Sequence, residues 1–500
     1  MTSEMTASVR VRSTWLWALL GLAGSVLTAY AAPRAVPDPA VRWWYVPAVP
    51  SGQALSLALV YAGMAALGCA WLGLGRALPS HRATLAIGAA WLLPLALAPP
   101  LFSRDVYSYL AQGTILHLGH SPYKSAPQLL ASLGRERVLD AVSPFWRGTT
   151  APYGPLFLGL VSVIVGVVGT NLVLGVLLIR LVEMSGIVLL AIFIPWLARA
   201  LGTDPRRALW LALLSPLVML ELIAAGHNDV MMAGMLVAGV ACALSGRPLL
   251  GIAICALAAT IKVPALAAVL FIAVAWGRAE PGRAAQVRFL AIAAVLTVAV
   301  LAFVSVATAS GIGWLSTSLF STPAKVRLAV TPATAVGYTL ASLLRDLGVT
   351  TSGRGLEGAL GLVASIVTVG AGLVLLSRVR VPRLVVLLGV FLLIAAAGGP
   401  AAWPWYFVWG LALLAAARSV QHSSALAAAI ALSVFIVKPD GILALPRSSA
   451  PVVLLVYVAA AAAVWHARRR PGPDRTPSTG RGDGDPPPIP TGAPSALAGR

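Results

Sequence analysis

Charged side chains are scarce in this chain, at 10% of its 500 residues, where a soluble domain carries roughly 25%. Acidic residues are scarcest, with 16 Asp and Glu against 36 Lys and Arg, and hydrophobic residues make up 59%. This lack of charge excludes a soluble globular protein. The net charge of +20 does not indicate a nucleic-acid partner, because the basic residues are scattered through short connections rather than gathered on one polar segment.

Cysteine is nearly absent, and its three positions, Cys69, Cys242 and Cys255, lie inside apolar runs without metal-ligand spacing. We interpret them as small buried residues rather than as ligands or disulfides. A glycine-rich nucleotide-binding loop is also missing. The sequence therefore predicts no metal site, no cofactor and no bound nucleotide.

Apolar runs recur along almost the whole chain, and each is near the roughly 20 residues that span a bilayer as a helix. Backbone groups in lipid must hydrogen-bond within their own segment, so the pattern predicts an all-α polytopic membrane protein of about 14 spans, with a range of about 12 to 16. Two runs contain polar interruptions and are interpreted as pairs of short helices: 171–200 at Arg180 and Glu183, and 249–276 at Lys262. The predicted spans lie near 14–32, 54–75, 83–101, 155–169, 171–200, 207–225, 230–245, 249–276, 287–309, 356–376, 384–400, 404–418, 424–437 and 451–467.

Arginines in the connections orient the spans, because cytoplasmic loops are enriched in Lys and Arg. This rule predicts a cytoplasmic N-terminus (1–13), a transmembrane domain (14–467) and a cytoplasmic tail (468–500) whose composition is typical of disorder. It requires that the two interrupted runs each cross twice or turn back. The two longest connections, 102–154 and 310–355, then lie on the outer face, where long loops often carry function.

One carboxylate stands where the third predicted span ends and the long outer connection begins. Asp105 lies in SRDVYSY (103–109), and a base beside a membrane surface can act on substrates held by lipids. The alternative is that it pairs with Arg104 or caps the following helix. Candidate substrate-binding residues in this connection are Arg104, Tyr107, Tyr109, Tyr123 and Tyr153.

A second polar group closes one apolar run and opens the next, where Glu221 is followed by His227, Asn228 and Asp229. Polar residues at membrane depth are functional candidates, so we interpret this group as the lip of an active-site cavity. Helix capping by Asn228 or Asp229 is an alternative. One His with two short acidic or amide groups does not specify a metal site.

Aromatic side chains and lysines complete the candidate site. Trp403 and Trp405 lie in WPWYFVW (403–409), whose rings either stack on sugars or anchor at lipid headgroups. Cations on the outer side suit a ligand that carries phosphate. Lys262 is the strongest candidate, since an unpaired lysine in an apolar run demands a partner unless it snorkels. The candidate phosphate-binding cations are Lys262, Lys325, Arg327 and Lys438.

The order of these motifs resembles that of the GT-C superfamily of membrane glycosyltransferases. SRDVYSY (103–109), GHSPY (119–123) and PYGPL (152–156) resemble the outer loop of that superfamily. GHND (226–229) followed by IKVP (261–264) is similar to its polyprenol-phosphate-mannose-dependent branch. The likeness is greatest to the actinobacterial α-1,6-mannosyltransferases that build the mannan core of lipomannan and lipoarabinomannan, and it covers roughly residues 80–440.

The resemblance implies a GT-C fold in the plasma membrane, with the active site on the outer face. It implies a polyprenyl (decaprenyl-type) phosphomannose donor and a lipid-anchored mannan or phosphatidylinositol mannoside acceptor. Asp105 would be the general base of an inverting displacement, and the branch is regarded as metal-independent. An arabinosyltransferase that uses polyprenyl phosphoarabinose, another GT-C transferase, and a transporter or flippase of lipid-linked sugar remain alternatives.

Overall fold

The computed structural model describes residues 2–38, 40–45, 52–318, 331–349, 353–399, 401–444 and 447–458. Residues 1–454 form one compact unit, and residues 455–500 form a second, of which residues 455–458 are described, as helix. The predicted tail (468–500) and the end of the last predicted span lie outside the described residues. Within the described ranges the chain is helical and contains one isolated antiparallel bridge, between Val437 and Leu443.

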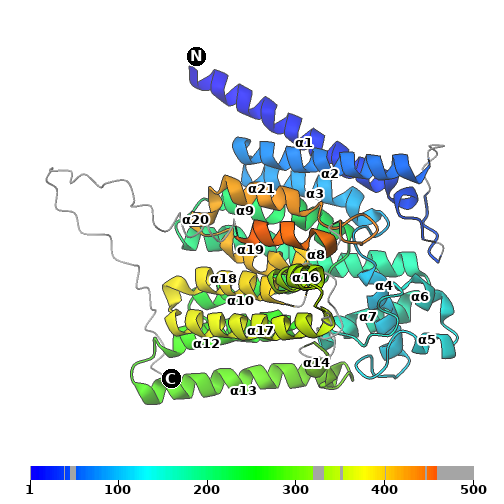
Figure 1. Cartoon of the computed structure of the whole chain (residues 1–500). Coiled ribbons are helices and arrows are strands. Elements are labelled where there is room, and N and C mark those ends of the chain that lie inside the picture. The colour runs from blue at the N-terminus through cyan, green and yellow to red at the C-terminus, as the bar shows by residue number, and fades with distance from the viewer. Residues whose placement is uncertain are drawn as a thin grey trace. The chain divides into compact units, whose positions relative to one another are not determined.

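The helices follow one another as short and long segments (Figure 1). The first third contains α1 (Thr2–Ala35), α2 (Gln53–Ala77), α3 (His81–Leu97), α4 (Asp105–His117), α5 (Leu129–Ser132), α6 (Glu136–Ala141) and α7 (Pro155–Val168). The middle contains α8 (Leu172–Ala200), α9 (Pro205–Leu213), η1 (Leu217–Ala224), α10 (Asp229–Leu244), α11 (Pro248–Ala259), η2 (Val263–Ala265), α12 (Leu266–Gly277), α13 (Arg283–Ala307) and α14 (Gly313–Ser316). The last part contains α16 (Pro332–Asp346), α17 (Gly353–Arg378), η4 (Val381–Arg383), α18 (Leu384–Gly398), η5 (Pro404–Phe407), α19 (Val408–Leu414), α20 (Arg418–Gln421), α21 (Ser424–Ser433) and η6 (Arg447–Ser449).

Length and composition support a polytopic membrane protein. Among the described residues, six helices are long and apolar enough to cross a bilayer, or up to seven if the bent pair α9 and η1 is one span. Seven further apolar segments of 10–17 residues are shorter than a span: His81–Leu97, Pro155–Val168, Asp229–Leu244, Pro248–Ala259, Val263–Gly277, Pro404–Leu414 and Ser424–Ser433. The predicted count of about 14 spans is therefore not confirmed. The six long segments are Ser13–Ala35, Gln53–Ala77, Leu172–Ala200, Arg283–Ala307, Gly358–Arg378 and Val381–Gly398.

The predicted break in the run 171–200 is wrong, because α8 is one unbroken helix. Arg180 and Glu183 are both buried inside it. The Arg180 guanidinium donates hydrogen bonds to three backbone carbonyls, those of Ala96, Ala98 and Ala224, at 2.8, 2.5 and 2.5 Å. These bonds replace hydration, so the helix does not have to open to bring the charge to water.

The predicted break in the run 249–276 is confirmed. The helix α11 ends at Ala259, and Lys262 has extended backbone angles (φ −151°, ψ 129°) before the short turn η2. Pro264 lies in the first turn of the segment that continues into α12. A proline there removes a backbone donor, which favours this interruption of the helix.

Glycines set the spacing between α8 and α10. A Cβ atom on Gly186 would lie 2.2 Å from the Val230 carbonyl oxygen, and one on Gly234 would lie 2.5 Å from the Gly186 carbonyl oxygen. Small residues allow transmembrane helices to approach this closely. The start of α10, which carries Asp229, therefore packs directly on α8 near Arg180 and Glu183.

The connection 102–154 is more ordered than its sequence predicts. It contains α4, α5 and α6, and α4 is almost entirely buried. A Cβ on Gly113 of α4 would meet Val161 of α7, so these two helices are in close contact. Figure 1 shows α4, α5, α6 and α7 together at one end of the long helices. The second long connection, 310–355, contains α14 and α16, and its residues 319–330 and 350–352 lie outside the described part of the chain.

Candidate active site

A strained backbone turn places Asp105 at the first position of α4. Phe102 has a φ of +66°, a left-handed conformation that costs a bulky residue about 1–3 kcal/mol. The Phe102 N–H donates to the carbonyl of Pro439 at 2.8 Å, and the Leu101 N–H donates to that of Ala224 at 3.1 Å. These bonds from two other parts of the chain hold the turn, and with it the direction in which Asp105 leaves the backbone.

The Asp105 carboxylate has no strong cationic partner among the described residues. The Tyr153 hydroxyl donates to its Oδ2 atom at 3.4 Å, and the His227 Nε2 atom lies 3.9 Å from the same oxygen. Burial is the main cause that raises the pKa of Tyr153, followed by the nearby charge of Asp105, so Tyr153 remains a hydrogen-bond donor. The Asp105 side chain is 16% exposed. It is therefore partly accessible and held by one long hydrogen bond.

His227 is fixed by its neighbours on two sides. It follows Gly226, whose φ of +72° suits a residue without a Cβ, in the turn between η1 and α10. Its Nδ1 atom lies 2.5 Å from the carbonyl oxygen of Glu221. Its ring stacks on Trp405 at 4.0 Å between centroids, and Trp405 stacks on Trp403 at 4.8 Å. The structure thus brings both predicted tryptophans to the candidate site.

Asp229 and Lys262 form a largely buried ion pair beside His227. The Lys262 Nζ atom lies 2.8 Å from each Asp229 carboxylate oxygen, and the Trp409 indole donates to Oδ1 at 2.6 Å. The Lys262 ammonium also lies over the ring of Tyr406, 4.7 Å from its centroid. Lys262 therefore has the partner that a lysine in an apolar run demands, and this partner is a carboxylate of the protein itself. Its partner lies 33 residues away, a distance that the local pattern of the sequence does not bridge.

The segment PYGPL docks on the turn that carries Lys262. The Gly154 N–H donates to the Ile261 carbonyl at 2.9 Å, and the Leu156 N–H donates to that of Thr260 at 2.9 Å. A Cβ on Gly154 would lie 2.1 Å from the Thr260 carbonyl oxygen, so no other residue fits without movement. This contact brings Tyr153 to the candidate site. Tyr109 joins it from α4, with its ring edge-on to Tyr153 at 4.7 Å.

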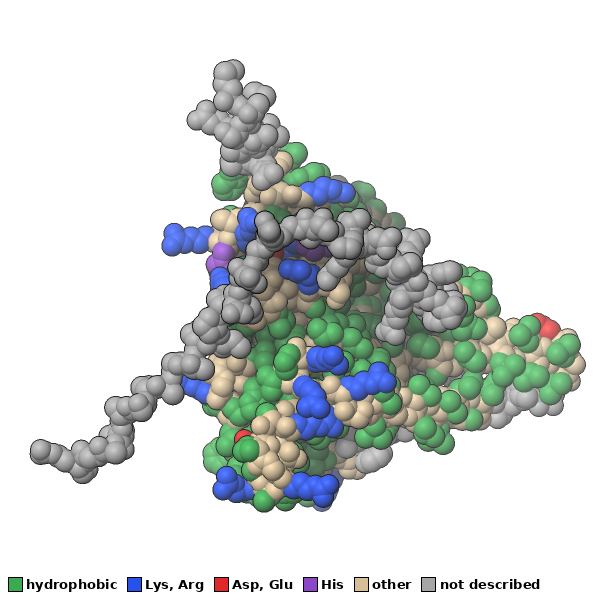
Figure 2. Space-filling view, turned by 90° about the vertical axis from the view of Figure 1, so that its left-hand side faces the viewer, with side chains coloured by type: hydrophobic (Ala, Val, Ile, Leu, Met, Phe, Trp, Pro, Cys, Tyr) green, Lys and Arg blue, Asp and Glu red, His purple; other side chains and the backbone are tan. Residues whose placement is uncertain are grey.

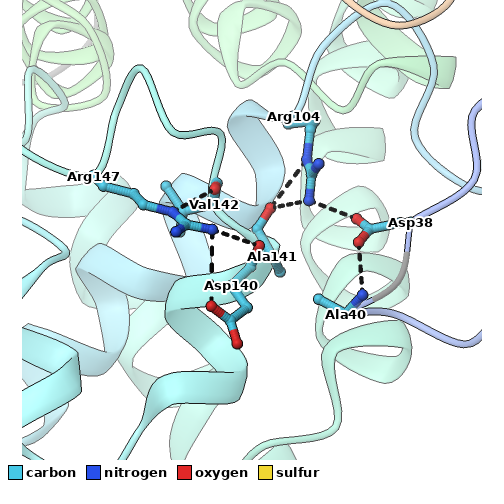
Figure 3. Close-up of polar contacts among 7 residues, drawn as sticks. All are labelled: Asp38, Ala40, Arg104, Asp140, Ala141, Val142 and Arg147. Atoms are coloured by element: carbon cyan, nitrogen blue, oxygen red, sulfur yellow. Dashed lines mark hydrogen bonds and ion pairs between the residues drawn. The ribbon is translucent and has the colours of Figure 1, made fainter.

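Arg104 turns toward other elements (Figure 3). Its guanidinium donates to the Ala141 carbonyl from Nε and Nη2, at 3.1 and 2.6 Å, and forms a 2.7 Å ion pair with Asp38. Asp38 also accepts the Ala40 N–H, and the Arg147 guanidinium donates to the backbone carbonyls of Asp140 and Val142 at the same end of α6. Arg104 thus joins the α1–α2 connection to α6, and it is not the partner of Asp105.

Several other predicted site residues lie elsewhere. The Arg104 Cζ atom lies 5.8 Å from the centroid of the Tyr107 ring. Tyr123 is buried against Gly313. Lys438 faces Asp440 at 3.9 Å. Lys325 and Arg327 lie outside the described residues. Asn228 is the residue before α10 and is buried, but its side chain makes no capping hydrogen bond, so the capping interpretation is wrong for Asn228.

Sequence reasoning did not assign three residues to this site, although it named Arg180 as a helix interruption. Trp409 binds Asp229, and Arg180 joins the carbonyls of Ala98 and Ala224, which flank the turns that carry Asp105 and His227. Tyr406 packs under Lys262. The signal for Arg180 is a charge inside a long apolar run, and for the two aromatics it is their spacing from Trp405. Among the described residues, no group of three or more His, Cys, Asp or Glu side chains is arranged to hold a metal ion.

Comparisons with known proteins identify the family. Residues 17–278 match the model of the alpha-(1->6)-mannopyranosyltransferase N-terminal domain, and residues 331–469 match that of the MptB C-terminal domain. The alpha-(1->6)-mannopyranosyltransferase A of Mycobacterium tuberculosis is 37% identical over 414 residues, which are 78% of this chain and 77% of that protein. The alpha-(1->6)-mannopyranosyltransferase B of Corynebacterium glutamicum is 28% identical over 520 residues, 92% of this chain and 83% of that protein.

A third relative, a probable alpha-(1->6)-mannopyranosyltransferase of Mycolicibacterium smegmatis, is 34% identical over 450 residues, 80% of this chain and 78% of that protein. No solved structure matches the chain. One family model alone covers more than half of the chain, and its description agrees with the resemblance that the motifs carry. The chain therefore belongs to the alpha-(1->6)-mannopyranosyltransferase family, the mannosyltransferases that its motifs resemble.

Proposed function

We propose that this protein transfers mannose from polyprenyl phosphomannose to a growing, lipid-anchored α-1,6-mannan, with Asp105 as the general base. The observation that carries the proposal is the Asp105 carboxylate itself. It is partly exposed, it faces Tyr153 and His227, and no Lys or Arg side chain is paired with it among the described residues. A carboxylate without a strong ion pair can accept a proton from a substrate hydroxyl.

In this reaction the acceptor hydroxyl attacks the anomeric carbon of the donor while Asp105 removes its proton. The bond from that carbon to the phosphate oxygen breaks, and its electron pair leaves with polyprenyl phosphate. One displacement inverts the anomeric carbon, so a β-linked donor gives an α-linked product. Trp405 stacks on His227 and Trp403 stacks on Trp405, which places the two predicted sugar-binding rings near the base.

The leaving phosphate requires a cation, because preorganised positive charge stabilises an anion that develops in the transition state. Lys262, Lys325, Arg327 and Lys438 remain the candidates. Two of the three donors of the Lys262 ammonium are occupied by Asp229, which leaves one for phosphate. In this proposal Asp229 and Trp409 hold Lys262 at the edge of the site, where its side chain is 14% exposed.

The proposed topology follows from the unbroken α8. The helix α7 packs closely on α4, which begins the long connection that we place at the outer face. We therefore keep α4 and α7 at the outer face, let α8 cross once, and let α11 and α12 cross separately. The arginine-bearing turns then share the cytoplasmic face. Figure 2 shows Lys and Arg side chains gathered on one end of the molecule, where acidic side chains are rare.

Donor selectivity in detergent tests this function. We expect the purified protein to move labelled mannose from polyprenyl phosphomannose to a short α-1,6-mannoside, and to use neither GDP-mannose nor polyprenyl phosphoarabinose. Transfer without a bilayer separates catalysis from transport. Faster use of the arabinose donor would favour an arabinosyltransferase. Movement of labelled donor across vesicles, with no transfer in detergent, would favour a flippase and contradict the proposal.

Gly154→Ala is expected to lower turnover about 10²-fold, because the added Cβ would lie 2.1 Å from the Thr260 carbonyl oxygen. The docked segment must move by about 1 Å, and such a displacement of catalytic groups can cost that factor. Gly148→Ala is the matched control, since the nearest atom to its added Cβ is 3.6 Å away. Equal turnover of the two variants, measured in the donor assay above, would show that the docking contact does not position the site.

A further inference from the structure

The tautomer of His227 follows from its partner. Its Nδ1 atom lies 2.5 Å from the Glu221 carbonyl oxygen, which can only accept a hydrogen bond. Nδ1 must therefore carry a proton, and in the neutral ring Nε2 has a lone pair. Nε2 is buried and makes no hydrogen bond with a described residue. It lies 3.9 Å from the Asp105 Oδ2 atom. Two proton acceptors therefore face each other, and neither carries a proton to donate to the other.

We propose that His227 is the second proton acceptor of the reaction, and that it shares with Asp105 the proton released by the acceptor hydroxyl. This inference rests on the proposed role of Asp105 as the base. The separation of 3.9 Å is longer than a hydrogen bond, but catalytic contacts in substrate-free enzymes commonly tighten when the substrate binds. A proton placed between Oδ2 and Nε2 turns two facing acceptors into a hydrogen-bonded pair.

The proton of the acceptor hydroxyl moves in two steps. The acceptor O–H bond breaks as the new bond to the anomeric carbon forms, and the proton goes to Asp105. It then passes to His227 Nε2, which becomes an imidazolium whose Nδ1–H still donates to the Glu221 carbonyl. Asp105 regains its negative charge beside that imidazolium. The polyprenyl phosphate leaves with the electron pair of the broken glycosyl bond, and the proton afterwards returns to water.

The surroundings of His227 suit an imidazole that is neutral before the reaction and briefly protonated during it. Burial is the main cause that lowers its pKa, the carboxylates of Asp105 and Asp229 raise it in part, and Lys262 lowers it. Tyr153 approaches Asp105 from the opposite side as a neutral donor. The Trp405 face, stacked on the ring at 4.0 Å, attracts the imidazolium once it forms. The imidazole therefore remains unprotonated near neutral pH and still has partners for its charged form.

His227→Asn tests the proposal, because the shorter amide keeps a donor near Nδ1 for the Glu221 carbonyl and loses Nε2. We expect kcat at pH 7.5 to fall about 10²-fold, the lower end of what a positioned proton acceptor contributes, with the donor KM within twofold. The wild-type kcat should also fall as the pH drops through the pKa of His227, below its ordinary value of about 6.5. His227→Asn should lose that acidic limb. His422→Asn, at an exposed histidine, is the control.

Two results would overturn the proposal: a wild-type kcat in His227→Asn, or a lowered kcat with an unchanged acidic limb, which would indicate a structural role. If His227→Asn does not fold, His227→Ala replaces it, with imidazole added to the assay. Recovery of kcat by imidazole supports the relay, and recovery of the melting temperature alone contradicts it. Asp105→Asn is measured in parallel. Full transfer by that variant would refute Asp105 as the base, whatever His227 shows.

Discussion

Asp105→Asn is expected to lower mannosyl transfer by about 10²- to 10⁴-fold, the usual contribution of a general base. The amide keeps the size of the side chain and can still accept the Tyr153 hydroxyl, but it cannot take a proton. The melting temperature should stay close to that of the wild type. A carboxylate in the first turn of α4 contributes about 0.3–1 kcal/mol through the helix dipole, so its loss has a small effect on stability.

Asp140→Asn is the matched control for this variant. Asp140 lies in the same connection, 102–154, its side chain is 62% exposed, and its ion pair with Arg147 is long, at 3.8 Å. We expect this control to keep the wild-type turnover. Turnover of a folded Asp105→Asn protein equal to that of Asp140→Asn would remove Asp105 from the catalytic role. A large loss of melting temperature in Asp105→Asn would indicate that the carboxylate is structural.

The second large expected effect is a loss of stability when one member of the Asp229–Lys262 ion pair is removed. Removing one member of a buried ion pair strands the other charge, at a cost of about 3–5 kcal/mol. Lys262→Met and Asp229→Asn should therefore each lower the melting temperature strongly. The double variant should recover most of that loss, since it leaves no stranded charge. The measurement is a thermal unfolding series on the four proteins of this cycle.

The same cycle tests whether Lys262 binds the donor phosphate. If it does, the stable double variant should still show a raised KM for the donor and an unchanged KM for the acceptor. If Lys262 serves the fold alone, restoring stability should restore both constants. A double variant as unstable as the sum of the single variants would contradict the coupling that the 2.8 Å contacts predict. Lys124→Met is the control, since Lys124 is exposed and has no place in the candidate site.

The sequence predicts the class of this protein well, because hydropathy is a local property. Apolar runs identify helices wherever they occur, and the break at Lys262 follows from a lysine two residues before a proline. The order of the motifs also predicts that Tyr153, His227 and Trp405 belong to one site. The structure brings these residues around Asp105 although they come from segments far apart in the chain.

The sequence does not predict which polar groups meet. The partners of Arg180 are backbone carbonyls, and carbonyls leave no trace in a pattern of residue types. The charge in α8 therefore indicates a break that the structure does not contain. Arg104 stands next to Asp105 in the sequence, yet its guanidinium lies against Asp38 and Ala141. The number of spans is equally unpredictable from the runs alone, because helices of 10–17 residues are too short to be counted by length.

The configuration and linkage of the product test the central claim most directly. Purified protein is given β-linked polyprenyl phosphomannose, labelled with ¹³C at the anomeric carbon, and a short α-1,6-mannoside acceptor. One displacement assisted by Asp105 predicts that the new mannose is α-linked to the 6-hydroxyl, with a signal that Asp105→Asn lacks. A β-linked product, or label that appears as free mannose rather than on the acceptor, would contradict the account.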